Sequence, residues 1–189
     1  MTLVLCVITG FLYPGVVTGL AQLLFNRQAN GSLVTVNGRV VGSELIGQPF
    51  TRPEYFHPRP SAAGNGYDAS ASAGTNKGPT DRKLADSLIG PRADSLVAAG
   101  VPKGDVPTDA VTASASGLDP HISPANAYLQ VARVARARGA DSAAVRRVLD
   151  AHVEGRQFGF FGEPRVNVLL LNIALDSAFA AKRTAQTSR

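Results

Sequence analysis

Apolar residues form one long, unbroken run at the beginning of the chain. The segment TLVLCVITGFLYPGVVTGLAQLLF, residues 2–25, contains no charged side chain. A helix of that length rises roughly 36 Å, whereas the hydrocarbon core of a bilayer is about 30 Å thick. The run therefore predicts a membrane-spanning helix, with residues 1–26 as an anchor.

A cleaved signal peptide is the alternative to an anchor. Signal peptides have a basic start, an apolar core of about 7–15 residues and a small-residue cleavage site. The run in this chain is longer, no Lys or Arg precedes it, and no A-x-A motif follows it. These differences favour an uncleaved anchor.

Small residues interrupt the apolar run at Gly10, Pro14, Gly15 and Gly19. Gly15 and Gly19 are four residues apart, a spacing that lets a second membrane helix approach closely. Membrane helices also tolerate Gly and Pro without any such contact. Gly10, Gly15 and Gly19 are thus candidates for helix packing, and both interpretations stay open.

Alternation of apolar and polar residues follows the anchor. In SLVTVNGRVVGS, residues 32–43, this alternation surrounds Asn37-Gly38. Asn-Gly supplies the two positive φ angles of a type I′ turn, so the segment predicts a β-hairpin. The next segment, ELIGQPF, is expected to extend this small sheet.

Helical spacing dominates the second half of the chain. Residues 80–100 predict a helix capped by Thr80 or Asp81, which Gly90-Pro91 should end or kink. Ser123-Pro124 and Gly139 have the residue types of a helix start and stop. Further helices are expected from Asp141 to near Gly155 and, after a turn at residues 162–164, along an apolar stretch to Ala181.

These patterns predict an α+β protein. A single transmembrane helix is followed by one small mixed domain, residues 27–189, with a short β-hairpin or sheet, about four helices and long ordered loops. The length suffices for one ordinary soluble domain or for a smaller domain with an attachment device.

Composition removes several classes of function. The net charge is +5, but charged residues make up only 17% of the chain, and the basic residues are scattered. Without a nucleic-acid-binding motif this gives no reason to expect a nucleic-acid partner. The single cysteine, Cys6, excludes a disulfide framework and a cysteine zinc site.

A tract rich in Gly, Ala, Ser, Asn and Pro occupies residues 47–81. It could be a disordered linker, a phosphate-binding loop or an ordered surface loop. GNGYDA, residues 64–69, matches G-x-G-x-x-A but lacks the preceding strand and following helix of a dinucleotide site. Tyr55 and Phe56 lie before most of the tract and are expected to anchor it.

Ser116, Asp119 and His121 have the residue types of a catalytic triad. Three loop residues so close in sequence cannot easily adopt the required geometry, and a nucleophile elbow is missing. A metal site made by His57 and His121 with Asp119 or Asp68 is conceivable, but such histidines more often make plain hydrogen bonds. We therefore expect neither a catalytic residue nor a bound metal.

Longer stretches carry a family resemblance. GSELIGQPFTRPEYFHPRPSAAGNGYD, VTASASGLDPHISPANAYLQVARVARARG and GEPRVNVLLLNIALD occur in this order behind one N-terminal apolar helix. Together they resemble KdpC, the C subunit of the Kdp potassium-transporting P-type ATPase. The similarity covers nearly the whole chain.

The resemblance implies a non-catalytic subunit of a high-affinity potassium uptake pump. Its expected partners are a channel-like potassium-binding subunit, an ATP-hydrolysing P-type subunit and often a very small fourth subunit. The family is described as a catalytic chaperone that raises the affinity of the pump subunit for ATP. The expected location is the cell membrane, with one span and with the soluble domain on the extracytoplasmic side.

No cofactor of its own is expected, since the resemblance implies that ATP binds to the partner ATPase subunit. A membrane-anchored nucleotide-binding or hydrolytic protein is the alternative, with Gly64, Gly66, Ser116 and Asp119 as weak ligand-binding candidates. The Gly-rich tract is expected to be an ordered loop that lies on partner subunits. The residues expected at that interface are Tyr55, Phe56, His57, Arg59, Tyr67, Asp68, Asp119 and His121.

Overall fold

A computed structural model describes residues 1–186 of the chain. It divides into two compact units, Met1–Leu45 and a second unit that begins at Ile46. Each unit is described by itself.

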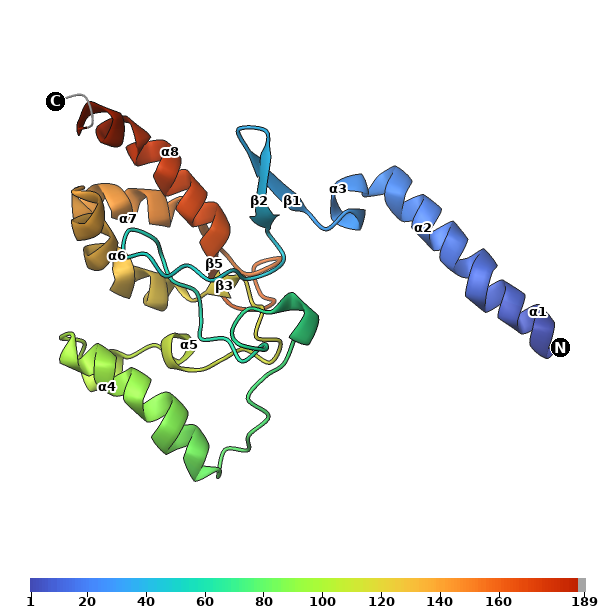
Figure 1. Cartoon of the computed structure of the whole chain (residues 1–189), viewed down its shortest axis with the longest axis horizontal. Helices are drawn as coiled ribbons and strands as arrows, with labels where there is room; N and C mark the ends of the chain where they lie inside the picture. Colours follow the sequence, from blue (N-terminus) through green and yellow to red (C-terminus); the bar gives the residue numbers. More distant parts are fainter. Residues whose placement is uncertain (187–189) are drawn as a thin grey trace. The chain divides into compact units, whose positions relative to one another are not determined.

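The first unit begins with a helical rod made of α1 (Thr2–Val7), the π-helical turn η1 (Ile8–Leu12) and α2 (Tyr13–Leu24) (Figure 1). Thr2–Leu24 is long and apolar enough to cross a membrane, as predicted. None of its side chains is buried against protein. An apolar surface of this kind suits a lipid environment. The short helix α3 (Asn26–Ala29) follows.

The predicted hairpin is confirmed. Strands β1 (Leu33–Val36) and β2 (Arg39–Ser43) pair antiparallel, and φ is +51° at Asn37 and +77° at Gly38. The expected extension of this sheet by ELIGQPF is wrong. The chain turns away after β2, and the Glu44 amide donates to the Ser32 carbonyl over 3.2 Å.

Three helices form the main layer of the second unit: α6 (Pro124–Arg138), α7 (Ser142–Asp150) and α8 (Val168–Gln186) (Figure 1). The predicted start of α6 is confirmed, because the Ser123 hydroxyl accepts from the Asn126 amide. Its predicted stop is confirmed by the left-handed backbone of Gly139. Helix α7 ends at Asp150, earlier than expected.

A small antiparallel sheet with the order β3-β5-β4 accompanies these helices. Its strands are β3 (His121–Ile122), β4 (Val153–Glu154) and β5 (Arg165–Asn167). Such short strands show no alternation of apolar and polar residues, so the sequence did not predict this sheet.

The core lies between the helices and the small sheet. Its members come from α6, α7, α8, β3, β5 and the Gly-rich tract, and they are Phe56, Ile122, Ala127, Val131, Val134, Ala135, Val145, Leu149, Val166, Val168, Leu171 and Leu175. Phe56 contributes a fully buried aromatic ring from a segment without regular secondary structure. The tract is therefore part of the folded unit.

A separate helical arm consists of the π-helical turn η3 (Leu84–Ile89) and α4 (Gly90–Ala98), and none of its residues is fully buried. The Asp81 carboxylate caps its start by accepting from the Lys83 amide. Gly90-Pro91 was predicted to end or kink the helix. Of these two outcomes the end is wrong, because the chain stays helical through Pro91. A π turn precedes the proline here, as η1 precedes Pro14, and it accommodates the missing N–H.

The remaining elements are single turns: η2 (Ala69–Ala71), η4 (Lys103–Asp105) and α5 (Thr108–Val111). Helix α5 links the arm to the rest of the unit, and its Val111 is buried. The second unit thus consists of a part with a buried core and a more exposed helical arm.

Candidate functional site

Two side-chain amides hold the backbone at the start of the Gly-rich tract. Asn172 of α8 accepts from the Phe56 amide over 2.8 Å and donates to the Phe56 carbonyl over 3.0 Å. Gln130 of α6 accepts from the His57 amide over 2.7 Å and donates to the His57 carbonyl over 3.0 Å. Each amide thus supplies both hydrogen bonds that a neighbouring strand would otherwise supply. We call these four bonds the amide clamp.

Two arginines bind the chain just before the amide clamp. Arg133 donates to the carbonyls of Pro53 and Tyr55, over 2.6 and 3.1 Å. Arg138 donates to the Glu54 carbonyl over 2.6 Å and lies over the Tyr55 ring, with its guanidinium carbon 5.2 Å from the ring centre. These contacts fix four successive residues, 54–57, against α6 and α8.

The hydroxyl of Tyr55 adds a connection to α8. It donates to Asp176 over 3.0 Å, and Arg138 Nη2 lies 3.0 Å from the other carboxylate oxygen of Asp176. The predicted anchoring role of Tyr55 and Phe56 is therefore confirmed. The Phe56 side chain itself lies in the core, while Tyr55 and His57 are partly exposed.

A second cluster lies farther along the tract. The Arg59 guanidinium and the Asp119 carboxylate form an ion pair, with Nη1 and Oδ2 3.0 Å apart. Asp119 Oδ1 accepts from the His121 amide over 3.0 Å, and the Tyr67 hydroxyl donates to the Arg59 carbonyl. The structure thus brings together four of the predicted interface residues.

Burial and charge shift two pKa values in this cluster. Burial alone would raise the pKa of Asp119, but hydrogen bonds from His121 and the charge and hydrogen bond of Arg59 lower it below its ordinary value. Burial, with a contribution from the charge of Asp119, raises the pKa of Tyr67 to about 12. At neutral pH the cluster therefore holds an ionised Asp119 and a neutral Tyr67.

Backbone contacts join the two stretches that carry these side chains. The Ser61 hydroxyl donates to the Gly117 carbonyl over 2.7 Å and accepts from the Tyr67 amide over 2.8 Å. The Ala73 amide donates to the Ser116 carbonyl over 3.0 Å. We call residues 59–74 together with 113–121 the loop surface. Its network of contacts confirms that the tract is ordered.

Close packing at Gly117 shows how little space the loop surface leaves. Gly117 has φ +67°, and a Cβ at this position would lie 2.6 Å from the Ala63 nitrogen and 2.7 Å from the Ala73 oxygen. Both the backbone angle and the space favour glycine. The two stretches can meet only because this residue has no side chain.

The geometry at Gly64 and Gly66 differs from that of a phosphate-binding loop. Such a loop needs backbone amides that are free to converge on an anion. Here the amides of Gly66 and Asp68 both donate to the Ala63 carbonyl, and that of Tyr67 donates to Ser61. The Asp68 carboxylate is exposed and caps the turn η2 by accepting from the Ser70 amide.

Ser116 lies in a turn of its own. Its hydroxyl accepts from the Leu118 amide over 3.1 Å, while His121 Nδ1 faces Asp119 at 3.6 Å. A triad would require the serine hydroxyl to reach the histidine. In the contacts found within residues 1–186, Ser116 and His121 are not joined.

An open groove of about 530 Å³ lies beside the loop surface. Its lining carries both signs of charge and consists of Arg59, Thr108, Asp109, Thr112, Asp119, His121, Ile122, Ser123, Glu163, Pro164 and Arg165. Asp109 is already engaged, because it accepts from the amide and the hydroxyl of Ser123. Mixed charges in a shallow groove suit a polar protein surface better than a small anion.

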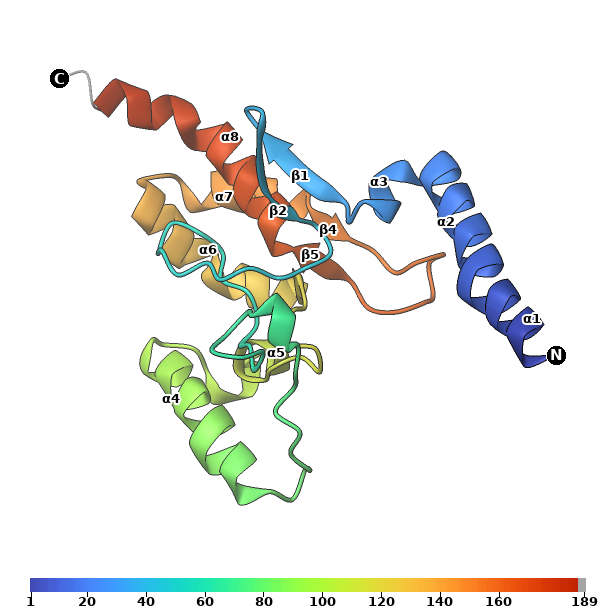
Figure 2. The same ribbon diagram turned by 45° about the vertical axis from the view of Figure 1, so that its right-hand side comes forward.

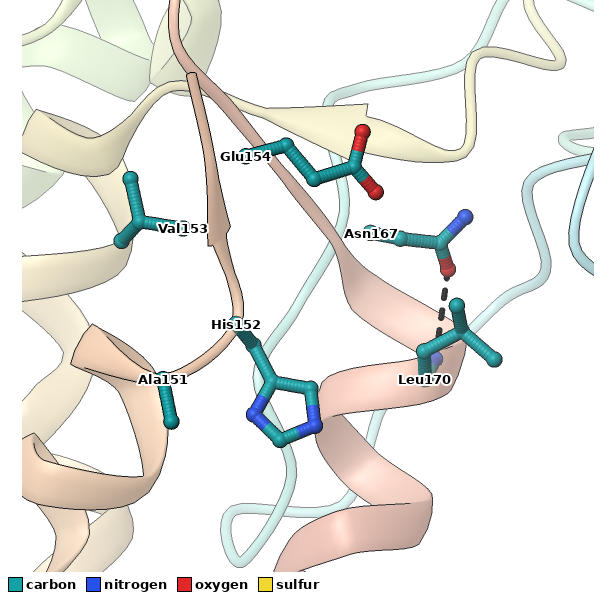
Figure 3. A pocket seen from close by; sticks show the side chains of 6 residues that line it. All are labelled: Ala151, His152, Val153, Glu154, Asn167 and Leu170. Carbon is teal, nitrogen blue, oxygen red and sulfur yellow. Dashed lines mark hydrogen bonds between the residues drawn. The ribbon is translucent and has the colours of Figure 1, made fainter.

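Figure 3 shows a smaller pocket of about 190 Å³ at the beginning of α8. The carboxylate of Glu154 and the amide of Asn167 come from the neighbouring strands β4 and β5, and the His152 ring comes from the turn after α7. Arg165 Nε already donates to Glu154 over 2.9 Å, and Asn167 accepts from the Leu170 amide over 3.2 Å. These polar groups therefore serve the sheet and the helix start.

The remaining predicted positions lie elsewhere. Gly10, Gly15 and Gly19 belong to the helical rod of the first unit, where a Cβ at any of the three would meet open space. Their proposed packing against another helix stays a prediction. Across residues 1–186, no three His, Cys, Asp or Glu side chains gather in a way that could hold a metal ion.

Sequence analysis missed the residues that hold the tract in place, namely Gln130, Arg133, Arg138, Asn172 and Asp176. All five are polar residues of the helices α6 and α8. A buried side-chain amide such as that of Asn172 needs a hydrogen-bond partner. An amide side chain in an apolar stretch was therefore the signal available in the sequence. The partner itself could not be deduced, because Asn172 and Phe56 are 116 residues apart.

The fold defines a class of protein: an α+β chain with one helix long and apolar enough to cross a membrane. A family model described as "K+-transporting ATPase, c chain" (KdpC) matches residues 1–177. The chain therefore belongs to the KdpC family.

Individual relatives agree with the family model. A potassium-transporting ATPase KdpC subunit from Gemmatimonas aurantiaca is 60% identical over 190 residues, covering 100% of this chain and 95% of the relative. The KdpC subunit from Myxococcus xanthus is 62% identical over 178 residues, covering 92% and 82%. That from Koribacter versatilis is 56% identical over 179 residues, covering 93% and 90%.

The packing at Gly117 gives a first prediction. Gly117→Ala should lower the free energy of unfolding by about 2–4 kcal/mol, because it adds positive-φ strain to a steric clash. Gly104→Ala is the matched control, since a Cβ there meets open space. Denaturant unfolding of the full chain in detergent measures both. Equal stabilities of the two variants would contradict the account.

His57 gives a prediction about pH. Burial lowers the pKa of His57 and the charge of Arg133 lowers it further, against the effect of the hydrogen bond to the Arg52 carbonyl. Because the folded pKa lies below the unfolded value of about 6.5, this contribution to stability is present above pH 6.5. It is lost as the pH falls through the folded pKa.

His57→Gln stays neutral across this range, so its stability should fall less than that of the parent chain as the pH is lowered from 6.5. Denaturant midpoints measured at a series of pH values would show the difference. Parallel pH profiles for the parent and the variant would contradict this role of His57.

Proposed function

We propose that this chain is a non-catalytic accessory subunit of a potassium-transporting ATPase, required for assembly of the complex. The observation that carries the proposal is the amide clamp, with the arginine contacts beside it. A long tract of small residues that is held in one conformation can dock without a large loss of entropy. The family membership supports the assignment to this pump.

The expected partners are the channel-like potassium-binding subunit and the P-type ATPase subunit, often with a very small fourth subunit. The helix Thr2–Leu24 would place the chain in the cell membrane with a single span. The loop surface and its groove would face the partners, with Arg59, Asp119 and His121 as polar contacts. We further propose that the second unit is extracytoplasmic.

An extracytoplasmic domain would act on ATP binding without touching ATP. It would favour the pump conformation whose cytoplasmic site binds ATP better, which is the role of a catalytic chaperone. Allosteric coupling of this kind typically changes affinity by roughly 5–150-fold. The engaged amides of Gly66, Tyr67 and Asp68 support this indirect route over a direct nucleotide contact.

A direct test compares the purified pump with pump from which this chain has been stripped after assembly. The KM for ATP should be roughly 5–150-fold higher in the pump that lacks it. Adding back the Arg59→Ala/Asp119→Ala double variant should restore ATP affinity only in part, whereas the matched control Arg82→Ala, on the exposed start of the arm, should restore it fully. An unchanged KM without the chain would contradict the proposed role.

The side of the membrane is tested on the same complex in intact cells. Ser95→Cys on the exposed face of α4, with Cys6→Ala, provides one thiol in the second unit. A membrane-impermeant thiol reagent should label it from outside the cytoplasmic membrane. Labelling only after that membrane is lysed would make direct contact with ATP the better explanation.

A further inference from the structure

The loop that connects β4 and β5 has an apolar tip. Phe158 is 88% exposed, Phe160 65% and Phe161 58%. Figure 2 shows the connection as a long loop that extends away from the layer of α6, α7 and α8. We call residues 157–162 the aromatic tip. Exposed apolar surface concentrated in this way marks a binding site more often than chance.

The aromatic tip has a fixed shape. Gln157 and Phe161 exchange two backbone hydrogen bonds, each of 2.9 Å, and the Phe160 amide also donates to the Gln157 carbonyl over 3.2 Å. The rings of Phe160 and Phe161 lie against each other with centres 4.2 Å apart. The backbone hydrogen bonds of the turn and the contact between the two rings thus hold the tip in one shape, without help from the core.

Backbone strain is part of this shape. Phe158 has φ +53°, a left-handed conformation that an aromatic residue seldom adopts. Its neighbour Gly159 has φ +81° and Gly162 has φ +73°, so the turn is built around such angles. Backbone strain that does not help the packing of the core often serves a function.

The charges beside the tip favour a protein over a lipid surface. Arg156 pairs with Glu163 across the base of the tip at 2.7 Å, and Arg165 pairs with Glu154 at 2.9 Å. The loop therefore has no net charge to attract anionic headgroups, which bind basic clusters. A fluid bilayer also requires no fixed arrangement of rings, whereas a protein pocket does.

The aromatic tip is too small to form a stable interface with a second copy of this chain by itself. The exposed parts of the three rings amount to roughly 400 Å² of apolar surface, since one such side chain buries about 200 Å². A stable pairwise interface needs about 800 Å² on each partner. The tip is thus suited to be one anchor within a larger contact surface.

We propose that the aromatic tip inserts into an apolar pocket on another subunit of the ATPase, outside the membrane. Phe158 and Phe160 are the anchors, and the Arg156–Glu163 pair remains at the polar rim. This inference rests on the proposed function, because it requires a multi-subunit pump. It adds a docking element that is separate from the loop surface around Arg59 and Asp119.

The test uses the full chain in the assembled pump. In Phe158→Ser/Phe160→Ser, the affinity for the remaining subunits should fall at least about tenfold, as expected for buried aromatic anchors. Val97→Ser, another exposed apolar position in the second unit, is the control and should bind like the parent. Both variants should unfold at the parent's temperature, because these side chains lie outside the core.

A photo-crosslinker identifies the occupant. Phe158→p-benzoylphenylalanine should form an adduct with another pump subunit when the purified complex is illuminated. Adducts only with lipid, or only with a second copy of this chain, would overturn the proposal. Binding of the double serine variant equal to that of the parent would overturn it as well.

The two levels of inference can fail separately. A parent chain that does not co-purify with the other pump subunits would contradict the proposed function. A parent that co-purifies, together with a double serine variant that co-purifies equally well, would contradict only the role of the tip.

Discussion

The backbone of Phe56 and His57 makes its hydrogen bonds to the side chains of Asn172 and Gln130. This arrangement lets a segment without regular secondary structure enter the core, because buried backbone groups must be paired. Phe56 can then join the core with side chains of α6, α7 and α8. Leaving two buried backbone groups unpaired costs about 1–3 kcal/mol for each group, so the amide clamp and the core depend on each other.

The loop surface is ordered because the backbone just before it is held in place by these hydrogen bonds. Residues 54–57 are fixed by Arg133, Arg138 and the amide clamp, and the chain leaves them in a defined direction toward Arg59. Ser61 and Gly117 then join the two stretches of the loop surface by short contacts. Small side chains allow this close approach and lose little entropy when ordered. An ordered loop surface is the result.

Local signals explain what the sequence could predict. The helix along the uncharged run at residues 2–25, the turn at Asn37-Gly38 and the helix start at Ser123 and Pro124 each depend on neighbouring residues, and the structure confirms all three. The first helix is long and apolar enough to cross a membrane. The sheet β3-β5-β4 was missed because its strands are two or three residues long. Their pairing depends on contacts far apart in sequence. At Pro91 the predicted helix end is wrong, because a π turn before the proline lets the helix continue.

The candidate site was predictable in part. Tyr55 and Phe56 stood out as aromatics before a tract of small residues, and Arg59, Asp119 and His121 belong to stretches that carry the family resemblance. Gln130 and His57, by contrast, are 73 residues apart, and nothing local links a helical glutamine to that backbone. In the sequence the aromatic tip is only a group of neighbouring Phe residues, because exposure is a property of the folded chain.

Amide hydrogen exchange of the full chain in detergent, without partner subunits, tests the central claim most directly. If the amide clamp exists in the free chain, the amides of Phe56 and His57 should exchange nearly as slowly as those in the buried parts of α6 and α8. Exchange of these two amides at the rate of an unstructured loop would contradict it. The loop surface would then lack a fixed starting point in the free chain.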